Sequence, residues 1–507
     1  MNFKGNSYKR FAPACFIAVL VVLLSQSSCR REGFEDSSSS LLRFSTDTVV
    51  FDTIFATVGS ITKRLKVYND HDKTIKISNI SIAGNSPGVY NMNVDGEQGT
   101  SLNDIEILPD DSIYIFLEAL IDVTSENAPF YVKDSVVFSF NGNAQDVDLI
   151  AWGQNAHYYY KNNADTFFNG EGDTLLFSHY LIEEDTHWEN DKPHLLFRTV
   201  IVRNGATLTI DPGAKVYLHS NSNIIVHDNA KLNILGGVTE ESKVLITGDR
   251  LDDFYKKLPG QWGRIWYCQD AGPSTITNAE IRNGTTGIYL GGPYLAEEFN
   301  TSLTPKLSIE QTVVTNMLRH GLLFQSAQAT VDNSEISDCG EMNLFAYIGG
   351  EYQFRHCTFA NYFGGRNSPV LVLTNYVTDE QLNIDFHRDL SINIHNSIIF
   401  GGFDSELLLD NDETNQFDYH FNHCLLRLDE EDFDFNDELH YRSCLFNENP
   451  SFIKRYESRE SNYQLDTLSA VQNMAHDSIA LLLPYDLLNN IRWLDEGPDM
   501  GAYERID

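Results

Sequence analysis

Histidine and cysteine side chains stand next to each other at two places in the C-terminal half of the chain. His356 precedes Cys357, His423 precedes Cys424, and a further cysteine follows at Cys444. Imidazole and thiolate groups are ligands of zinc and related metals. Adjacent residues of a strand, however, point to opposite sides, and the chain has no CxxC or other close ligand spacing. We therefore interpret the cysteines as an inward row of small side chains and predict no metal site from them.

Carboxylates are concentrated between residues 404 and 438, where 13 Asp and Glu residues accompany a single basic residue, Arg427. Asp410, Asp412 and Glu413 could bind Ca²⁺, a hard cation that prefers oxygen ligands. They lack the glycine and the spacing of an EF-hand loop. We therefore prefer an acidic loop that faces solvent, and calcium is the one cofactor that the sequence suggests.

Catalytic pairs for polysaccharide cleavage are harder to find. Hydrolysis of a glycosidic bond needs two carboxylates about 5–10 Å apart. The neighbours Asp252 and Asp253 are expected in a loop, and the run Arg319-His320-Gly321 leads into apolar residues typical of a strand. Basic residues are too scattered to nominate the base of a lyase. We therefore nominate no catalytic residue.

Aromatic residues at Trp262, Trp266 and Tyr267 could stack on sugar rings. The alternative is that they pack inside the fold, as large aromatic side chains commonly do. Trp262 and Trp266 are four residues apart and could share one face of a strand. We prefer core packing.

A six-residue pattern decides which elements position these side chains. It reads apolar, any, Asn/His/Gln/Ser, small, any, apolar, and it recurs seven times. The copies are Ile276–Ile281, Ile309–Val314, Val331–Ile336, Phe354–Phe359, Ile394–Ile399, Phe421–Leu426 and Tyr441–Phe446. Inward positions of a flat strand are an even number of residues apart, whereas the first apolar and the small residue are three apart. The chain must therefore bend at the third position, where Asn tolerates a left-handed conformation.

The bend residues and the small residues are expected to form two stacked rows. The bend residues are Asn278, Gln311, Asn333, His356, Asn396, His423 and Ser443. The small residues are Ala279, Thr312, Ser334, Cys357, Ser397, Cys424 and Cys444. A pattern that returns every 20 to 40 residues is typical of a solenoid of stacked coils. The longer intervals predict loops near residues 291–306 and 364–390.

The N-terminus reads as a targeting segment. Residues 1–28 combine a basic start with an apolar run, which is typical of a signal peptide. Small residues directly before Cys29 resemble the lipobox of bacterial lipoproteins, which implies that Cys29 is lipidated. Residues 29–43 then form a polar tether. The alternative is an ordinary signal peptide with an incidental cysteine.

Charge excludes one class of partner. The chain has 36 basic and 72 acidic residues, a net charge of −36. Nucleic-acid binding needs a basic surface, so we predict no nucleic-acid partner. Five cysteines remain after Cys29, an odd and scattered set that does not suggest a disulfide framework.

Residues 44–153 alternate short strands with turns, which predicts an antiparallel β-sandwich. The runs Leu65–Asn69 and Ile75–Ile80, followed by Leu108–Ile113, resemble the immunoglobulin-like domains of the ASPM/SPD-2/Hydin type. The resemblance implies a spacer or adhesion module. Residues 154–199 are aromatic and acidic, and we interpret them as a connector and the cap of the solenoid.

Residues 200–504 are expected to hold the coils. Gly205–Val216 and Pro259–Ile265 resemble the opening coils of right-handed parallel β-helix proteins, Asn449–Phe452 their final coil, and Pro498–Glu504 their closing segment. The predicted fold is therefore all-β, an N-terminal Ig-like β-sandwich followed by a right-handed parallel β-helix. The whole layout resembles bacterial, Bacteroidota-like lipoproteins that combine these two domains.

Fold does not fix function. We expect a lipid-anchored protein of the cell envelope, at the outer membrane and facing the periplasm or the cell surface, with a structural or binding role. A polysaccharide or an envelope protein is the candidate ligand, and the sequence identifies no catalysis. Two alternatives stay open. One is a carbohydrate-active enzyme, a polysaccharide lyase or a glycoside hydrolase, and the other is an adhesin or a component of envelope assembly.

Overall fold

The computed structural model describes residues 33–55, 59–122, 130–168, 174–292, 306–379, 384–493 and 496–505. The chain divides into two compact units, Met1–Asn155 and Ala156–Asp507. The predicted lipidation site, Cys29, lies outside the described residues. No helix of the described residues is long and apolar enough to cross a membrane.

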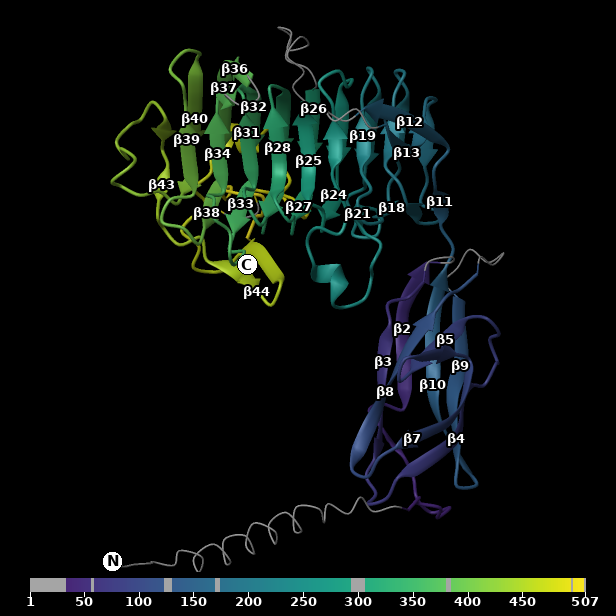
Figure 1. Ribbon diagram of the computed structural model, residues 1–507. Helices are drawn as coiled ribbons and strands as arrows, with labels where there is room; N and C mark the ends of the chain where they lie inside the picture. Colours follow the sequence, from purple (N-terminus) through teal and green to yellow (C-terminus); the bar gives the residue numbers. More distant parts are fainter. Residues whose placement is uncertain are drawn as a thin grey trace, which may run out of the picture. The chain divides into compact units, whose positions relative to one another are not determined.

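The first unit is a β-sandwich of two sheets (Figure 1). One sheet has the order β1 (Arg43–Phe44), β3 (Lys63–Asn69), β8 (Asp111–Ala119), β5 (Tyr90–Val94) and β6 (Glu97–Gly99). The other has the order β2 (Thr48–Phe55), β10 (Asn143–Gln154), β9 (Phe130–Phe140), β4 (Ile75–Ile82) and β7 (Ser101–Ile107). Alternate apolar residues such as Leu65, Val67 and Phe138 are fully buried between the sheets, as expected for half-buried strands.

The second unit is a parallel β-helix built from three sheets, which we name sheets A, B and C in the order that each full coil visits them. Sheet A contains β12 (Asn163–Phe168), β13 (Thr174–Ile182), β16 (Val200–Val202), β19 (Ile224–Val226), β22 (Ile265–Tyr267), β25 (Thr286–Gly291), β28 (His320–Gln325), β31 (Leu344–Tyr347), β34 (Leu371–Thr374) and β39 (Leu407–Asp410). Sheet B contains β14 (Thr186–Trp188), β17 (Thr207–Ile210), β20 (Lys231–Leu235), β23 (Ser274–Thr277), β26 (Lys306–Glu310), β29 (Gln328–Asp332), β32 (Gly350–Arg355), β37 (Leu390–His395), β40 (Phe417–Asn422) and β42 (Tyr441–Arg442). Sheet C contains β11 (His157–Tyr159), β15 (His194–Leu196), β18 (Lys215–Leu218), β21 (Val244–Gly248), β24 (Ala279–Arg282), β27 (Val313–Thr315), β30 (Glu335–Ser337), β33 (Thr358–Asn361), β38 (Ile398–Gly401), β41 (Leu425–Leu426) and β43 (Leu445–Phe446).

The six-residue pattern marks the corner between sheets B and C. Its first apolar residue is the last but one of a sheet B strand and its small residue leads into sheet C, as Ile276 and Ala279 do. All seven predicted bend residues have a positive φ, between 44° and 53°. The bend N–H groups donate to the next coil, for example from Asn333 to the Arg355 carbonyl oxygen at 2.9 Å. The predicted all-β fold, a β-sandwich followed by a right-handed parallel β-helix, is confirmed.

The ends of the β-helix differ from the sequence prediction. The first full coil consists of β13, β14 and β15, which pair in parallel with the strands of the second coil. The β-helix therefore begins within residues 154–199, which we had predicted to be only a connector and cap. The reason is that short strands such as β14 carry aromatic and polar residues that hide their periodicity. Aromatic packing does close this end, with Tyr159 and Trp188 ring centroids 4.8 Å apart.

One of the two expected loops and the predicted final coil also differ from the sequence prediction. The 364–390 interval contains β34 of sheet A and an antiparallel hairpin of β35 (Tyr376–Asp379) and β36 (Ile384–His387). The predicted final coil at residues 449–452 is instead the start of an antiparallel hairpin, β44 (Phe452–Glu457) and β45 (Glu460–Leu465). The other predicted loop, near 291–306, lies mostly outside the described residues. Short helical turns occur at η1 (Tyr255–Lys257) and α2 (Asp477–Ala480).

The C-terminal residues fold back along the outside of sheet C, and we call residues 449–505 the closing segment. Figure 1 shows β44 and the C-terminus beside β33 and β38. Met500 and Ala502 share a buried cluster with Ile398 of β38 and Leu425 of β41. At the far end of the stack, Phe433 and Phe435 pack against the main core and cover its last coil.

Candidate functional site

The outer face of sheet B carries a broad concave surface. Inward positions such as Leu307, Ile309 and Val331 are buried, so the alternating positions between them must face outward. These outward residues line a shallow groove of about 720 Å³, which we call the polar groove. Its outward lining residues include Thr275, Lys306, Ser308, Gln328, Thr330, Glu351, Gln353, Ser391 and Asn393.

The polar groove is built of stacked rows. Parallel register places Thr275 beside Ser308, Ser308 beside Thr330, and Thr330 beside Gln353. A second row places Lys306 beside Gln328 and Gln328 beside Glu351, whose carboxylate accepts a hydrogen bond from Gln328 at 2.7 Å. Neighbouring coils are about 4.8 Å apart. The groove therefore offers hydroxyl and amide groups at a regular spacing along the β-helix.

A pair of carboxylates follows the same face, one outward position further along the strands. Glu310 of β26 lies directly beside Asp332 of β29. Burial, and then the charge of Asp332, raise the pKa of Glu310. Burial also raises the pKa of Asp332, although Arg355 opposes this by donating two hydrogen bonds at 2.7 and 2.5 Å. Both carboxylates are thus biased toward the protonated form, and only Asp332 has a guanidinium that opposes this, so the two groups differ in the way that acid–base chemistry needs.

Sequence reasoning missed this pair because its members are far apart in the chain. The signal was nevertheless present in the repeats. Glu310, Asp332 and Arg355 all occupy the second position of the six-residue pattern, so the repeat register alone stacks them.

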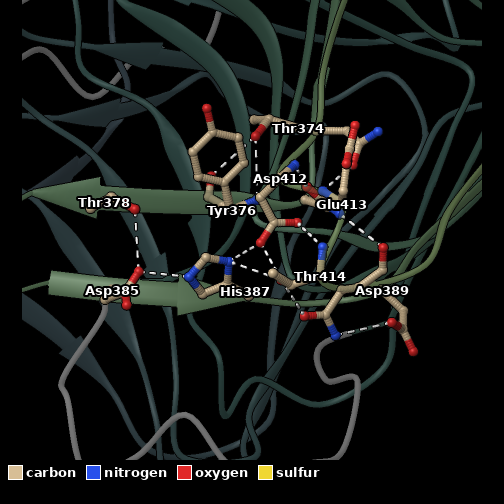
Figure 2. Close-up of polar contacts among 12 residues, drawn as sticks. Thr374, Tyr376, Thr378, Asp385, His387, Asp389, Asp412, Glu413 and Thr414 are labelled. Carbon is tan, nitrogen blue, oxygen red and sulfur yellow. Dashed lines mark hydrogen bonds and ion pairs between the residues drawn. The ribbon is translucent and has the colours of Figure 1, made fainter.

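A second polar cluster surrounds His387 at the base of the β35–β36 hairpin. Figure 2 shows the imidazole between Asp385 and Asp412. Its Nε2 lies 2.6 Å from the Asp385 carboxylate and its Nδ1 contacts Asp412. Hydrogen bonds that the imidazole donates to these two carboxylates raise the pKa of His387. The cluster connects the hairpin to the loop after β39. Directly after β36 the chain enters β37, whose Ser391 lines the polar groove.

The predicted calcium ligands are engaged in these contacts and do not converge. Asp410 accepts a hydrogen bond from the Tyr376 hydroxyl at 3.0 Å, and Asp412 contacts His387 and Thr414. Glu413 has a positive φ and a backbone N–H bonded to Asn411. Across the described part of the chain, no group of three or more His, Cys, Asp and Glu residues is arranged to hold a metal ion. Calcium binding stays a prediction.

The histidine and cysteine rows lie on opposite sides of the chain, as expected from their adjacency. Cys357 is buried in the main core, and its thiol donates to the Val331 carbonyl oxygen at 3.3 Å. His356 instead faces the closing segment and contacts Asn396 at 2.9 Å. Cys424 is buried in the same core as Cys357.

The remaining sequence candidates are mostly structural. Trp262 and Tyr267 are buried in the core, as preferred. Trp266 does not share their face: it lies half-buried on the outside of sheet A, with its ring stacked 5.2 Å from that of Tyr289. His320 starts β28, where burial lowers its pKa to about 4.

Comparison with known proteins adds little. No model of a known protein family matches the chain, and no curated protein matches it. Among solved structures, a family 123 glycoside hydrolase from Clostridium perfringens is 5% identical with a TM-score of 0.16, and the match covers 23% of this chain and 27% of that chain. The E. coli chaperone DraB is 10% identical with a TM-score of 0.17, covering 23% of this chain and 55% of that chain.

One neighbour spans more of the molecule. The catalytic domain of a GH87 alpha-1,3-glucanase in complex with nigerose is 11% identical, and the match covers 73% of this chain and 82% of that chain with a TM-score of 0.19. Likenesses at these TM-scores carry no argument about this chain, so function must be argued from its own surfaces.

Proposed function

We propose that the protein is a lipid-anchored protein of the cell envelope whose β-helix binds a neutral polysaccharide along the polar groove. The observation that supports this proposal is the stacked row Thr275, Ser308, Thr330 and Gln353. Hydroxyl and amide side chains donate and accept hydrogen bonds, which matches the hydroxyl groups of a sugar chain. A row that repeats with each coil suits a polymer better than a small ligand.

Charge supports a neutral polymer. The chain carries a net charge of −36, which repels polyanions over the scale of a Debye length. The groove itself contains one cation, Lys306, and one carboxylate, Glu351, in the same row, so these two charges balance each other.

The test is a binding and cleavage assay on residues 30–507 with a panel of neutral polysaccharides, run with and without calcium. Thr330→Val combined with Gln353→Leu removes polar groups from the groove and keeps residues that favour strands. We expect binding of the recognised polymer to weaken at least about tenfold, the equivalent of roughly 1.4 kcal/mol. Thr209→Val, on β17 of the same sheet but outside the groove, is the matched control. Equal binding by all variants would contradict the proposal.

A second candidate function is glycoside hydrolysis, which the Glu310 and Asp332 pair favours. Paired strands lie about 4.8 Å apart, and a retaining mechanism needs two carboxylates about 5 Å apart, so neighbouring positions on adjacent coils suit such a pair. Glu310, with its raised pKa, would donate a proton to the leaving oxygen, and Asp332 would stabilise or attack the sugar carbon. Cleavage products that disappear in Glu310→Gln, while binding persists, would establish the enzyme; binding without products would leave the binding function.

The lipid anchor is a separate part of the proposal and has its own test. Cys29→Ser should abolish incorporation of a radiolabelled fatty acid in cells, because acylation needs the thiol. Ser28→Ala is the control and should keep the label. Labelling that persists in Cys29→Ser would remove the anchor without affecting the groove.

A further inference from the structure

The β-sandwich exposes an aromatic surface on the outer face of the sheet that contains β3, β8 and β5. Tyr114 and Phe116 of β8 are 41% and 42% exposed. They are two residues apart on one strand, so they face the same way. Their ring centroids are 6.4 Å apart and their planes differ by 28°. The two rings therefore form a nearly flat platform that is open to solvent.

Two cations flank this platform. Lys66 lies beside Tyr114 and Arg64 beside Phe116 in the β3–β8 register. The Arg64 guanidinium is 5.3 Å from the Tyr114 ring centroid and the Lys66 ammonium is 5.2 Å from it. Among the described residues, neither cation has an ion pair with a carboxylate. In a chain with twice as many acidic as basic residues, two unpaired cations over exposed rings mark this face for an anionic partner.

A hollow of about 340 Å³ adjoins the platform at Phe116. Asn91, Asn93 and Gln98 supply amide groups around it, and Glu118, which accepts a hydrogen bond from Thr62 at 2.6 Å, lies at its edge. Amide groups beside an aromatic ring can hydrogen-bond the hydroxyls of a sugar while the ring contacts its apolar face. Arg64 and Lys66 lie beside Tyr114, at one end of the platform, and the Glu118 carboxylate lies beyond Phe116, at the other end.

We propose that this aromatic–cationic face of the β-sandwich binds an acidic glycan, a sugar chain that carries carboxylate or phosphate groups. Sugar rings pack on Tyr114 and Phe116, and their negative groups lie beside Arg64 and Lys66. Neutral hydroxyls reach the amides of the hollow, away from the cations. The site differs from the polar groove in fold unit, in its aromatic surface and in the charge of its ligand.

The experiment measures binding of residues 30–507 to polygalacturonate, to a phosphorylated mannan and to neutral dextran by affinity electrophoresis. We expect retardation by at least one of the two acidic polymers, and the two arms distinguish carboxylate from phosphate. Tyr114→Ala with Phe116→Ala should weaken that binding at least tenfold. Arg64→Gln with Lys66→Gln should weaken it and reduce its dependence on salt, because fewer ion contacts remain to be screened.

Matched controls keep the outcome interpretable. Tyr131→Ala removes another exposed aromatic residue, from β9 of the opposite sheet, and should leave acidic-glycan binding unchanged. The groove variant Thr330→Val with Gln353→Leu should also leave it unchanged, which separates this site from the proposed function. Circular dichroism and the unfolding midpoint check that each variant is folded.

Three results would overturn the proposal. The first is that neither acidic polymer retards the protein. The second is that Tyr114→Ala with Phe116→Ala binds the acidic polymer as well as the wild type does. The third is that the groove variant loses acidic-glycan binding. Light scattering addresses a different occupant: a dimer that dissociates on Tyr114→Ala with Phe116→Ala would assign the face to a second copy of the chain.

Discussion

Ser397 shows how little room the inner row of the β-helix leaves for a side chain. It is fully buried at the small position of its repeat. Its hydroxyl donates to the His395 carbonyl oxygen at 2.7 Å and accepts from the Cys357 N–H at 3.0 Å. One small side chain thus fills the space behind a bend and links two coils.

Replacing Ser397 by Leu should overfill this space. Overpacking of a buried position costs about 1–3 kcal/mol, so the free energy of unfolding should fall by that amount in urea titrations. The control, Ser308→Leu, places the same side chain at an exposed position of β26 and should change stability by less than about 0.5 kcal/mol. A neutral Ser397→Leu would show that the position does not face the core.

Glu335 is a buried carboxyl group that faces the closing segment. It accepts hydrogen bonds from the Ser337 hydroxyl at 2.6 Å and from the Tyr503 hydroxyl. Burial raises its pKa from 4.5 to about 7. Between these two pH values the folded chain binds the proton and the unfolded chain does not. Stability is therefore highest at low pH and falls as the pH rises toward 7.

Glu335→Gln should remove this pH dependence because the amide does not titrate. We expect the variant to lose less stability than the wild type between pH 5 and pH 8, by up to about 3 kcal/mol. Denaturant unfolding at a series of pH values measures the difference. The control, Glu351→Gln, changes an exposed residue of β32 and should follow the wild type; a Glu335→Gln curve parallel to the wild type would refute the assignment.

At the level of single residues, the repeats made the bends predictable. Asn278 and His356 share little chemistry, yet both bend because the spacing of apolar residues allows no flat strand. The Glu310 and Asp332 pair was not predicted. The pattern constrains the apolar, bend and small positions, whereas these two residues occupy its variable second position. The exposed platform of Tyr114 and Phe116 was not predicted either, because alternation marks outward residues without showing which of them gather.

At the scale of structural elements, Arg492 connects the closing segment to the β-helix. Its guanidinium is fully buried and donates to Glu504 at 2.9 Å, to Asn333 at 2.9 Å and to the Gly501 carbonyl oxygen at 3.1 Å. Asn333 is a bend residue of the β-helix, whereas Glu504 and Gly501 belong to the closing segment. A single side chain therefore fixes the segment to the corner between sheets B and C.

Arg492→Ala should release the closing segment. Removing one partner of a buried ion pair leaves the other uncompensated and costs about 3–5 kcal/mol. We expect limited proteolysis to cut within residues 449–505 much faster than in the wild type, while the coils stay protected. Arg442→Ala, at an exposed arginine of β42, is the control. Unchanged proteolysis of Arg492→Ala would mean that the other contacts of the segment, among them the hydrogen bond from Tyr503 to Glu335, hold it without Arg492.

Element boundaries were predicted less well than element types. Strands in the middle of the β-helix carry clear alternation, but the first coil begins in residues where Tyr159, Trp188 and His194 serve as both strand and cap. The final coil at Asn449–Phe452 was predicted from resemblance to β-helix proteins, and a resemblance over a few residues does not distinguish an antiparallel hairpin from a parallel coil. Pairing partners, which decide between the two, are not encoded locally.

At the scale of the whole molecule, each of the two units has its own apolar core. Phe138 belongs to the β-sandwich core and Phe324 to that of the β-helix. Domains with separate cores commonly unfold in separate transitions. Phe138→Ala should therefore lower the sandwich transition, by about 3–5 kcal/mol, and leave the β-helix transition in place.

Calorimetry, with tryptophan fluorescence as a second probe, measures the unfolding transitions of the two units. Trp152 lies in the sandwich and the other four of the five tryptophans lie in the second unit, so a Trp152→Phe background reports on the β-helix alone. Phe324→Ala is the reciprocal variant. Transitions that move together in both variants would show that the units unfold as one.

The last coil of the β-helix ends at β42 and β43, which no further strand of the described chain continues. Such an edge is a template for another chain, and an identical β-helix could in principle add to it and grow a filament. Phe433 and Phe435 plug the interior, while Glu430, Glu431 and Asp432 beside them face solvent. Two copies meeting here would bring like charges together. We therefore expect the acidic run to oppose such growth, and acid or high salt to weaken its effect.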